Sequence, residues 1–213
     1  MGKTTIKQIN VPFLDPKTIA DEADKFVTAY HPSLKPPIPI EEIAEFQLDI
    51  KVYPSGDLYP QHGIEGFINS NFNVLTIDQK IYEEKANRSR RRSTFAHEVA
   101  HIILHRDIFE GHDFNSKDEY LEFVDAIGER NIRLIEQQAY IFAGHVLVPS
   151  NLLDEQLGDA IKKAGGLSNM SLQDLTFIME ELKRSFQVSG EFLRHRITHQ
   201  HPEVLKAAEK LYK

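Results

Sequence analysis

The stretch RSRRRSTFAHEVAHIILH, residues 88–105, decides how the rest of the sequence is interpreted. It contains HEVAH, in which two histidines lie four residues apart and a glutamate follows the first. On a helix, positions i and i+4 face the same side, so His97 and His101 can present two imidazoles to one metal ion. Glu98 lies about 100° further round the helix, within reach of a water molecule at that ion. The pattern predicts a Zn²⁺ site with Glu98 as the catalytic general base.

The residues around the motif distinguish this site from an ordinary amphipathic helix that carries two half-buried histidines. The segment is apolar nearly all round, which predicts a buried helix. Burying His97, Glu98 and His101 without partners would cost several kcal/mol, and a bound metal ion would remove that cost. The metal site is therefore the preferred interpretation.

A catalytic zinc needs a third protein ligand, and the chain has no cysteine that could supply it. In IRLIEQQAYIFAGHVLVPS, residues 132–150, Glu136 shares a helical stripe with Ala139 and Ala143. Small side chains allow a facing helix to approach, so Glu136 is the predicted third ligand. Two alternatives stay open: Glu136 faces solvent at the helix edge, or Asp107 ligates the metal, although no glycine before it lets the helix turn back.

Two further histidines fit the metal site less well. His105 continues the i+4 series but lies two turns, about 12 Å, beyond His97 along the helix axis, so a capping or supporting role is predicted. His145 is nine residues beyond Glu136 and projects from roughly the opposite side of its helix. A packing or surface role is predicted for His145.

The order of elements predicts an α+β fold with a small antiparallel sheet followed by helices. The expected elements are a helix over residues 16–30, a proline-rich connector, a short helix over 40–47, a strand over 48–53 and two strands within 63–78. Then come the HEVAH helix, a polar loop over 106–118, a short amphipathic helix, a long helix over about 130–147 and a helical C-terminal third. The predicted division is an N-terminal helical extension with connector (1–36), a metal-binding domain (37–150) and a helical subdomain (151–213).

RRRSTFAHEVAHIILH followed by IEQQAYIFAGHVLVPS resembles the ImmA/IrrE family of zinc metallopeptidases. That family combines an HExxH helix with a later ExxAxxFAxxLLxP helix, and the resemblance covers roughly residues 37–200. It implies a minimal zincin-like α+β domain in which His97, His101 and Glu136 bind Zn²⁺ and Glu98 is the base.

The resemblance also implies a partner and a biological role. Family members typically cleave a helix-turn-helix transcriptional repressor and so act as antirepressors of mobile-element or stress genes. The alternative is a protein that binds and sequesters the repressor without cutting it, with a purely structural metal. Glu98 favours the peptidase, because a structural site needs no adjacent glutamate and prefers four protein ligands. His145 departs from the family pattern, in which small or apolar residues are usual.

Charge and hydropathy bound the remaining possibilities. The net charge of −7 argues against a general nucleic-acid-binding surface. Residues 186–197, with Arg194 and Arg196, superficially match a DNA-binding helix-turn-helix, but a hairpin that merely packs is favoured. The arginines of residues 88–92 are either a patch for an acidic substrate segment or, as preferred, a solvated or internally paired basic turn.

Neither a long apolar run nor an apolar N-terminal region is present, so the expectation is a cytoplasmic protein without a membrane span. The GKTT at residues 2–5 lacks the upstream glycine and strand of a phosphate loop and is interpreted as chance. Nothing in the sequence predicts the oligomeric state.

Overall fold

The computed structural model describes residues 11–56 and 58–211, which form two compact units. The first unit contains the described residues up to Ala23 together with Ile40–Ala143, and the second contains Asp24–Pro39 and the residues from Gly144 onward. The predicted three-part division stays a prediction. The GKTT segment and the N-terminal region on which the signal-peptide argument rests lie outside the described residues.

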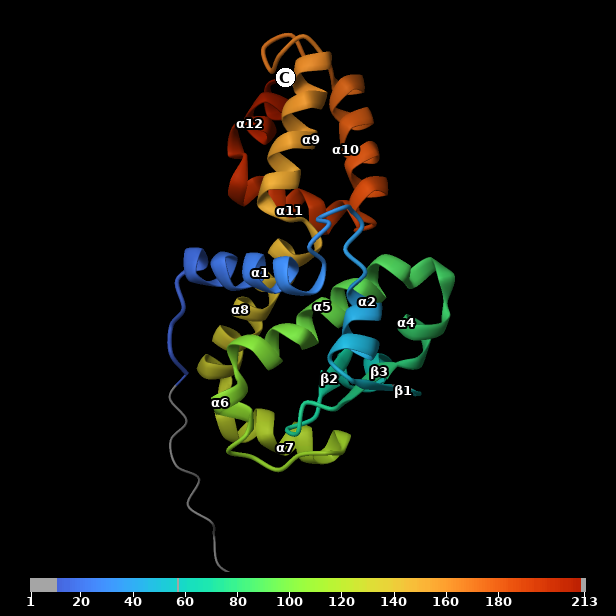
Figure 1. Cartoon of the computed structure of the whole chain (residues 1–213), viewed down its shortest axis with the longest axis vertical. Coiled ribbons are helices and arrows are strands. Elements are labelled where there is room, and N and C mark those ends of the chain that lie inside the picture. Colours follow the sequence, from blue (N-terminus) through green and yellow to red (C-terminus); the bar gives the residue numbers. More distant parts are fainter. Residues whose placement is uncertain (1–10, 57, 212–213) are drawn as a thin grey trace, which may run out of the picture. The chain divides into compact units, whose positions relative to one another are not determined.

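The first unit places short helices and the long helix α5 around a three-stranded sheet (Figure 1). Its elements after the connector are α2 (Ile40–Glu42), the π-helix η1 (Ile43–Gln47), β1 (Lys51–Ser55), α3 (Leu58–His62), β2 (Gly66–Ile68), β3 (Val74–Asp78), α4 (Gln79–Glu83), η2 (Lys85–Asn87), α5 (Arg88–Leu104), α6 (Arg106–Phe109) and α7 (Lys117–Ile127). Two helices extend across the unit boundaries, α1 (Pro16–Tyr30) and α8 (Glu129–Leu147). The predicted α+β class is confirmed.

The sheet is mixed, so the predicted antiparallel arrangement is wrong for one of its two strand pairs. The strand order is β1-β3-β2, and β2 pairs with β3 antiparallel across the turn that the sequence predicted. β1 pairs with β3 in parallel, with Lys51 opposite Val74. A parallel pair needs a crossover of a dozen or more residues, and the segment that contains α3 and β2 provides it. β2 is consequently an edge strand.

The turn between β2 and β3 is closed by the side chain of Asn69. Its Oδ1 accepts hydrogen bonds from the main-chain N–H groups of Asn73 and Val74, both at 3.0 Å. Its Nδ2 donates to Asn115 Oδ1 at 2.9 Å, which ties the turn to the segment before α7. An Asn side chain that replaces main-chain partners in this way is a common means of fixing a turn.

Two local predictions need correction. The first strand covers residues 51–55 rather than 48–53, because the chain turns at Asp49, whose φ is 54°. The predicted polar loop over 106–118 begins with the helix α6, and the buried ring of Phe109 anchors this helix in the core. Burial of one large aromatic ring offsets the otherwise polar composition of the segment.

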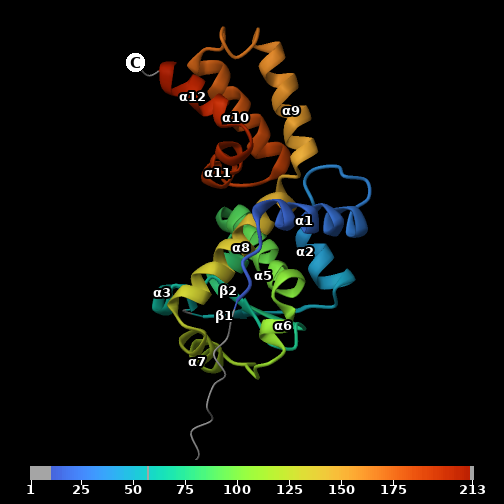
Figure 2. The same cartoon turned by 90° about the vertical axis from the view of Figure 1, so that its left-hand side faces the viewer.

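The second unit is helical (Figure 2). Its long elements are α9 (Ser150–Lys163), α10 (Leu172–Phe186), α11 (Gly190–Gln200) and α12 (Pro202–Leu211). The predicted break after α9 is present, since Gly165 and Gly166 both have positive φ and allow the chain to leave the helix. Ser171 then starts α10 with a capping box that involves Asp174. In the part of the chain that the structure describes, no helix has both the length and the apolar character required to cross a bilayer.

Candidate metal centre

The HEVAH motif lies in the middle of α5, and its surroundings are as apolar as the sequence predicted. The helix packs against β2, and its buried residues include Phe95, Val99 and Ala100 as well as Glu98 and His101. His101 is 3% exposed and Glu98 is 5% exposed. Burial in such surroundings means that every polar atom of the motif needs a partner.

His97, Glu98 and His101 form a group whose potential ligand atoms all lie within 4.8 Å of one another. The carboxylate of Glu136, from α8, contacts both histidines. Its Oε2 lies 2.9 Å from His97 Nε2, and its Oε1 lies 3.7 Å from His101 Nε2. The structure thus brings the predicted third residue to His97, 39 positions away along the chain, and to His101.

These donor distances fit a tetrahedral zinc site. With metal–donor bonds of about 2.1 Å, the donor atoms of a tetrahedral ion lie about 3.4 Å apart. The observed separations, 2.9 Å from His97 Nε2 to Oε2 and 3.7 Å from His101 Nε2 to Oε1 of the same carboxylate, fall on either side of this value. Two imidazoles and a carboxylate are also the donor set that catalytic zinc sites use. In type and position, the three side chains therefore fit a divalent metal ion such as zinc.

The electrostatics of the cluster also favour a cation between these side chains. Burial alone would lower the pKa of His97, but the hydrogen bond and the charge of Glu136 overcome this and raise it to about 9. Burial likewise raises the pKa of Glu136, and the bond to His97 and the histidine charges more than reverse this, lowering it to about 2. The carboxylate therefore stabilises positive charge at the position where the three donors meet.

Glu98 differs from Glu136 in both contacts and acidity. Its Oε2 accepts a hydrogen bond from the main-chain N–H of Ile68 in β2 at 2.8 Å. Burial raises the pKa of Glu98 to about 7, against the opposing charge of His97. A carboxyl with a pKa near neutrality can both accept and return a proton at neutral pH.

His105 lies at the C-terminal cap of α5 and contacts His101, so it fits both the capping and the supporting role that the sequence predicted. Its Nδ1 is 3.0 Å from Nδ1 of His101, and its Nε2 is 2.9 Å from Oε1 of Gln138. Sequence reasoning missed Gln138, because a residue two positions after Glu136 does not share its helix face. The predicted supporting role of His105 thus has a physical basis.

Tyr120, from α7, is a second residue that sequence reasoning missed. Its ring stacks on Phe67 of β2 with centroids 4.7 Å apart. Burial raises its pKa well above the ordinary value, and the charges of Glu136 and Glu98 raise it further. The phenol therefore stays protonated near the two carboxylates and can donate a hydrogen bond.

The other side chains weighed from the sequence lie elsewhere. Asp107 is exposed, on the helix α6 that follows α5. His145 belongs to the second unit, where its Nδ1 accepts a hydrogen bond from Arg196 at 3.0 Å. Arg196 is 5% exposed and also donates to the carbonyl of Gly144, so its guanidinium is not available to a DNA backbone. His145, where the family pattern usually has a small or apolar residue, is therefore accommodated by contacts within the second unit.

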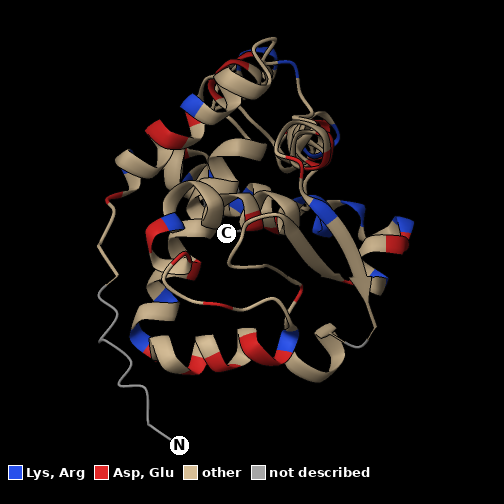
Figure 3. Cartoon of the chain, turned by 60° about the horizontal axis from the view of Figure 1, so that its bottom comes forward, with Lys and Arg blue, Asp and Glu red and all other residues tan. Residues whose placement is uncertain are grey.

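The arginines at the start of α5 are paired within the first unit, as the preferred interpretation predicted. Arg90 bonds Glu65 at 2.8 Å and lies over the ring of Tyr59, with 3.9 Å to its centroid. Arg91 bonds Glu41 at 2.5 Å. These partners offset the unfavourable placement of cations at a helix N-terminus. Along the ribbon as a whole, basic and acidic positions are interspersed (Figure 3).

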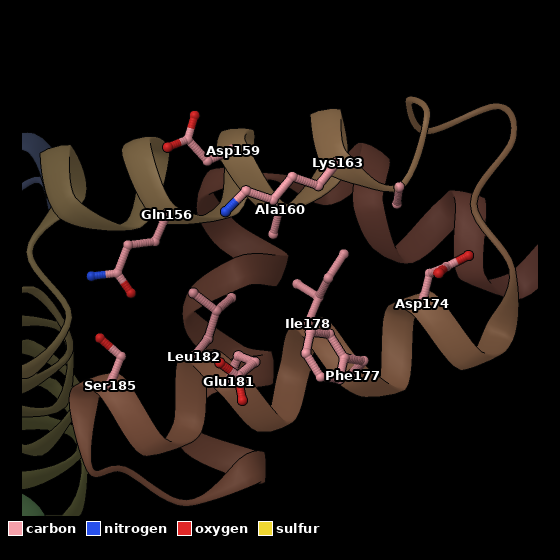
Figure 4. Close-up of a pocket in the computed structure, with 11 residues that line it drawn as sticks. Gln156, Asp159, Ala160, Lys163, Asp174, Phe177, Ile178, Glu181, Leu182 and Ser185 are labelled. Atoms are coloured by element: carbon pink, nitrogen blue, oxygen red, sulfur yellow. The ribbon is translucent and has the colours of Figure 1, made fainter.

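The second unit contains a pocket between α9 and α10 that differs chemically from the metal centre (Figure 4). Its volume is about 540 Å³, and its lining mixes apolar side chains such as Phe177 and Ile178 with charged ones such as Asp159 and Lys163. None of the residues that line it is a histidine. It therefore shares neither residues nor chemistry with the histidine cluster.

Comparison with known proteins agrees with this geometry. The sequence model of a peptidase family, described as the IrrE N-terminal-like domain, matches residues 81–198. This range runs from α4 to α11 and includes all four predicted site residues. No curated protein matches the chain.

Proposed function

Since the chain belongs to the peptidase family of IrrE N-terminal-like domains, we propose that it is a zinc-dependent endopeptidase. The observation that carries this proposal is the convergence of His97, His101 and Glu136 beside the buried carboxyl of Glu98. A site that only stabilised the fold would need no buried carboxyl group beside its ligands.

In the proposed site, His97, His101 and Glu136 hold the metal. When bound, a zinc ion supplies Lewis acidity, which makes a water molecule more acidic and polarises a carbonyl group. Glu98 accepts a proton from the attacking water and passes it to the leaving amine. The N–H of Ile68 holds Oε2 of Glu98, which leaves Oε1 to receive that proton.

The proposed substrate is a protein segment in extended conformation. β2 is an edge strand beside α5, and an added strand along such an edge is a common way to bind a peptide. The scissile bond would then lie next to Glu98, since this carboxylate is hydrogen-bonded to the same strand. Tyr120, stacked on Phe67 of β2, is a suitable donor for the oxygen that becomes negatively charged during attack.

We further propose that the substrate is a helix-turn-helix transcriptional repressor and that the protein acts in the cytoplasm as an antirepressor. The resemblance of the two motifs to the ImmA/IrrE family supports this choice. The net charge of −7 and the buried guanidinium of Arg196 favour a protein partner over direct binding to DNA.

The test incubates the purified, zinc-loaded protein with its candidate repressor and identifies new termini by mass spectrometry. Glu98→Gln keeps the shape of the side chain and is expected to bind zinc stoichiometrically but to leave the repressor intact. Glu122→Gln is the matched control, because it makes the same change at an exposed position of α7 and should cleave like the parent.

EDTA should prevent cleavage by the parent protein. Cleavage that persists in Glu98→Gln would contradict the assignment of the base. A stable complex in which the zinc-loaded parent makes no cut would instead support sequestration of the repressor.

A further inference from the structure

A line of hydrogen bonds connects His101 to the main chain near the start of the described residues. His101 Nδ1 lies 3.0 Å from Nδ1 of His105, and His105 Nε2 lies 2.9 Å from Oε1 of Gln138. Gln138 Nε2 donates in turn to the carbonyl of Pro12 at 2.9 Å, across 126 positions of sequence. The three side chains are between 1% and 3% exposed, so water does not compete for the two bonds between them.

The carbonyl of Pro12 determines which atom donates and which accepts in each hydrogen bond of this line. The carbonyl of Pro12 can only accept a hydrogen bond, so the atom of Gln138 that faces it is the amide nitrogen. The amide oxygen of Gln138 then faces His105. Because this oxygen also only accepts, His105 Nε2 must carry a proton.

The same reasoning extends to the metal centre. His105 is 1% exposed, and its ring nitrogens contact the neutral groups of Gln138 and His101, so a charge on its ring would be buried without an anion among its hydrogen-bond partners. A neutral ring with a proton on Nε2 has an unprotonated Nδ1, which accepts a hydrogen bond. His101 Nδ1 is therefore the donor, and Nε2 of His101, 3.7 Å from Glu136, keeps its lone pair.

We propose that Pro12, Gln138 and His105 form a positioning relay that holds His101 in the tautomer whose Nε2 can bind the metal. The proposal deepens the proposed function, since it assumes that this site takes a metal ion. His105 and Gln138 act through His101 and are positioning residues rather than catalytic ones. Phe109 supports the relay by stacking on the ring of His101, with centroids 5.1 Å apart.

The relay gives the N-terminal segment of the first unit a role in the metal centre. An imidazole with two equivalent tautomers would present a lone pair at Nε2 for only part of the time, and its ring would lack a fixed orientation. Partners of this kind typically contribute 10–100-fold to metal affinity. The relay is therefore expected to tighten zinc binding rather than to take part in proton transfer.

The first test reads the tautomers directly and does not depend on metal binding. Long-range ¹H–¹⁵N spectra of the protein in EDTA distinguish a ring protonated at Nδ1 from one protonated at Nε2. The expected result is Nδ1–H for His101 and Nε2–H for His105. A proton on Nε2 of His101 would overturn the proposal, whether or not the protein is a peptidase.

The second test uses a matched set of substitutions at His105 and measures the affinity for Zn²⁺ by competition with a chromophoric chelator. The amide of asparagine falls near the position of Nδ1 and can still accept from His101, whereas the amide of glutamine falls near Nε2 and cannot reach it. His105→Asn is expected to bind zinc nearly as well as the parent. His105→Gln and His105→Leu are expected to bind it about 10–100-fold more weakly.

A purely structural role for His105 predicts a different pattern, in which zinc affinity follows the loss of thermal stability in EDTA. Equal zinc affinities for His105→Asn and His105→Leu would overturn the relay. If His105→Leu does not fold, Gln138→Leu serves in its place. A zinc affinity in Gln138→Leu that falls by more than its loss of thermal stability explains supports the relay, and the affinity of the parent overturns it.

The two tests also distinguish failure of the relay from failure of the proposed function. Zinc binding by the parent with the wrong tautomer at His101 would refute the relay alone. The expected tautomers and zinc affinities in a protein that cuts no repressor would refute the peptidase proposal and leave the relay in place.

Discussion

Acidification is expected to destabilise the protein through His145, a residue remote in sequence from the HEVAH motif. The Nδ1 atom of His145 accepts a hydrogen bond from Arg196 at 3.0 Å, so protonation would break this bond and place two cations together. Burial, followed by the charge of Arg196, lowers the pKa of His145 from 6.5 to about 4. The unfolded chain lacks both effects and keeps the ordinary value.

The size of the effect follows from these two values. Between pH 6.5 and 4 the unfolded state binds more protons than the folded state, so the free energy of unfolding falls as the pH falls. The complete shift corresponds to about 3 kcal/mol. At pH 5 the unfolded histidine is almost fully protonated and the folded one is hardly protonated, which corresponds to a loss of about 2 kcal/mol.

The assay is urea unfolding at pH 8 and pH 5, followed by far-UV circular dichroism, for the parent and for His145→Asn. Asparagine places an acceptor near the position of Nδ1 but does not titrate. Other groups titrate in both proteins and cancel in the comparison. The parent should lose about 2 kcal/mol more than the variant over this interval. Equal losses would refute the reasoning from burial and from the charge of Arg196.

Three further predictions concern single substitutions. Gly66→Ala should lower the thermal melting temperature and reduce the free energy of unfolding by about 1–3 kcal/mol, because a Cβ there would lie 2.9 Å from Cγ2 of Thr94. An unchanged melting temperature would contradict this close contact. Glu136→Ala should abolish stoichiometric zinc binding in equilibrium dialysis, and retention of zinc at full affinity would move the third ligand elsewhere. Arg196→Met should cost about 1–3 kcal/mol in urea unfolding because the buried hydrogen bonds of the guanidinium to the carbonyl of Gly144 and to His145 Nδ1 are lost, and an unchanged midpoint would show that water replaces the guanidinium.

The long helices could be predicted from sequence because their signals are local. The spacing of apolar residues and the HEVAH motif predicted α5, and the proline after α8 predicted where that helix ends. The direction of β1 could not be predicted in this way. Whether β1 pairs with β3 in parallel depends on the path of the chain through α3, and no short window of sequence reports it.

In the site, too, features with a local sequence signal could be predicted, and contacts between distant segments could not. The contact between Glu136 and His97 was predicted because small residues mark the face of α8 that meets α5. The partners of the arginines at the start of α5 could not be identified from the sequence. Glu65 lies 25 positions from Arg90, and Glu41 lies 50 positions from Arg91. Pairings across such distances are decided by the folded structure, and the sequence alone left both interpretations of the arginines open.

The contact between Gln138 and Pro12 has a consequence for mutagenesis. Because the acceptor at residue 12 is a main-chain carbonyl, replacement of the proline by alanine keeps it. An alanine scan would therefore classify residue 12 as neutral and would detect the relay only at its side-chain members. Shortening the chain beyond residue 12 removes the carbonyl itself, so a series of N-terminal deletions is the experiment in which this contribution would become visible.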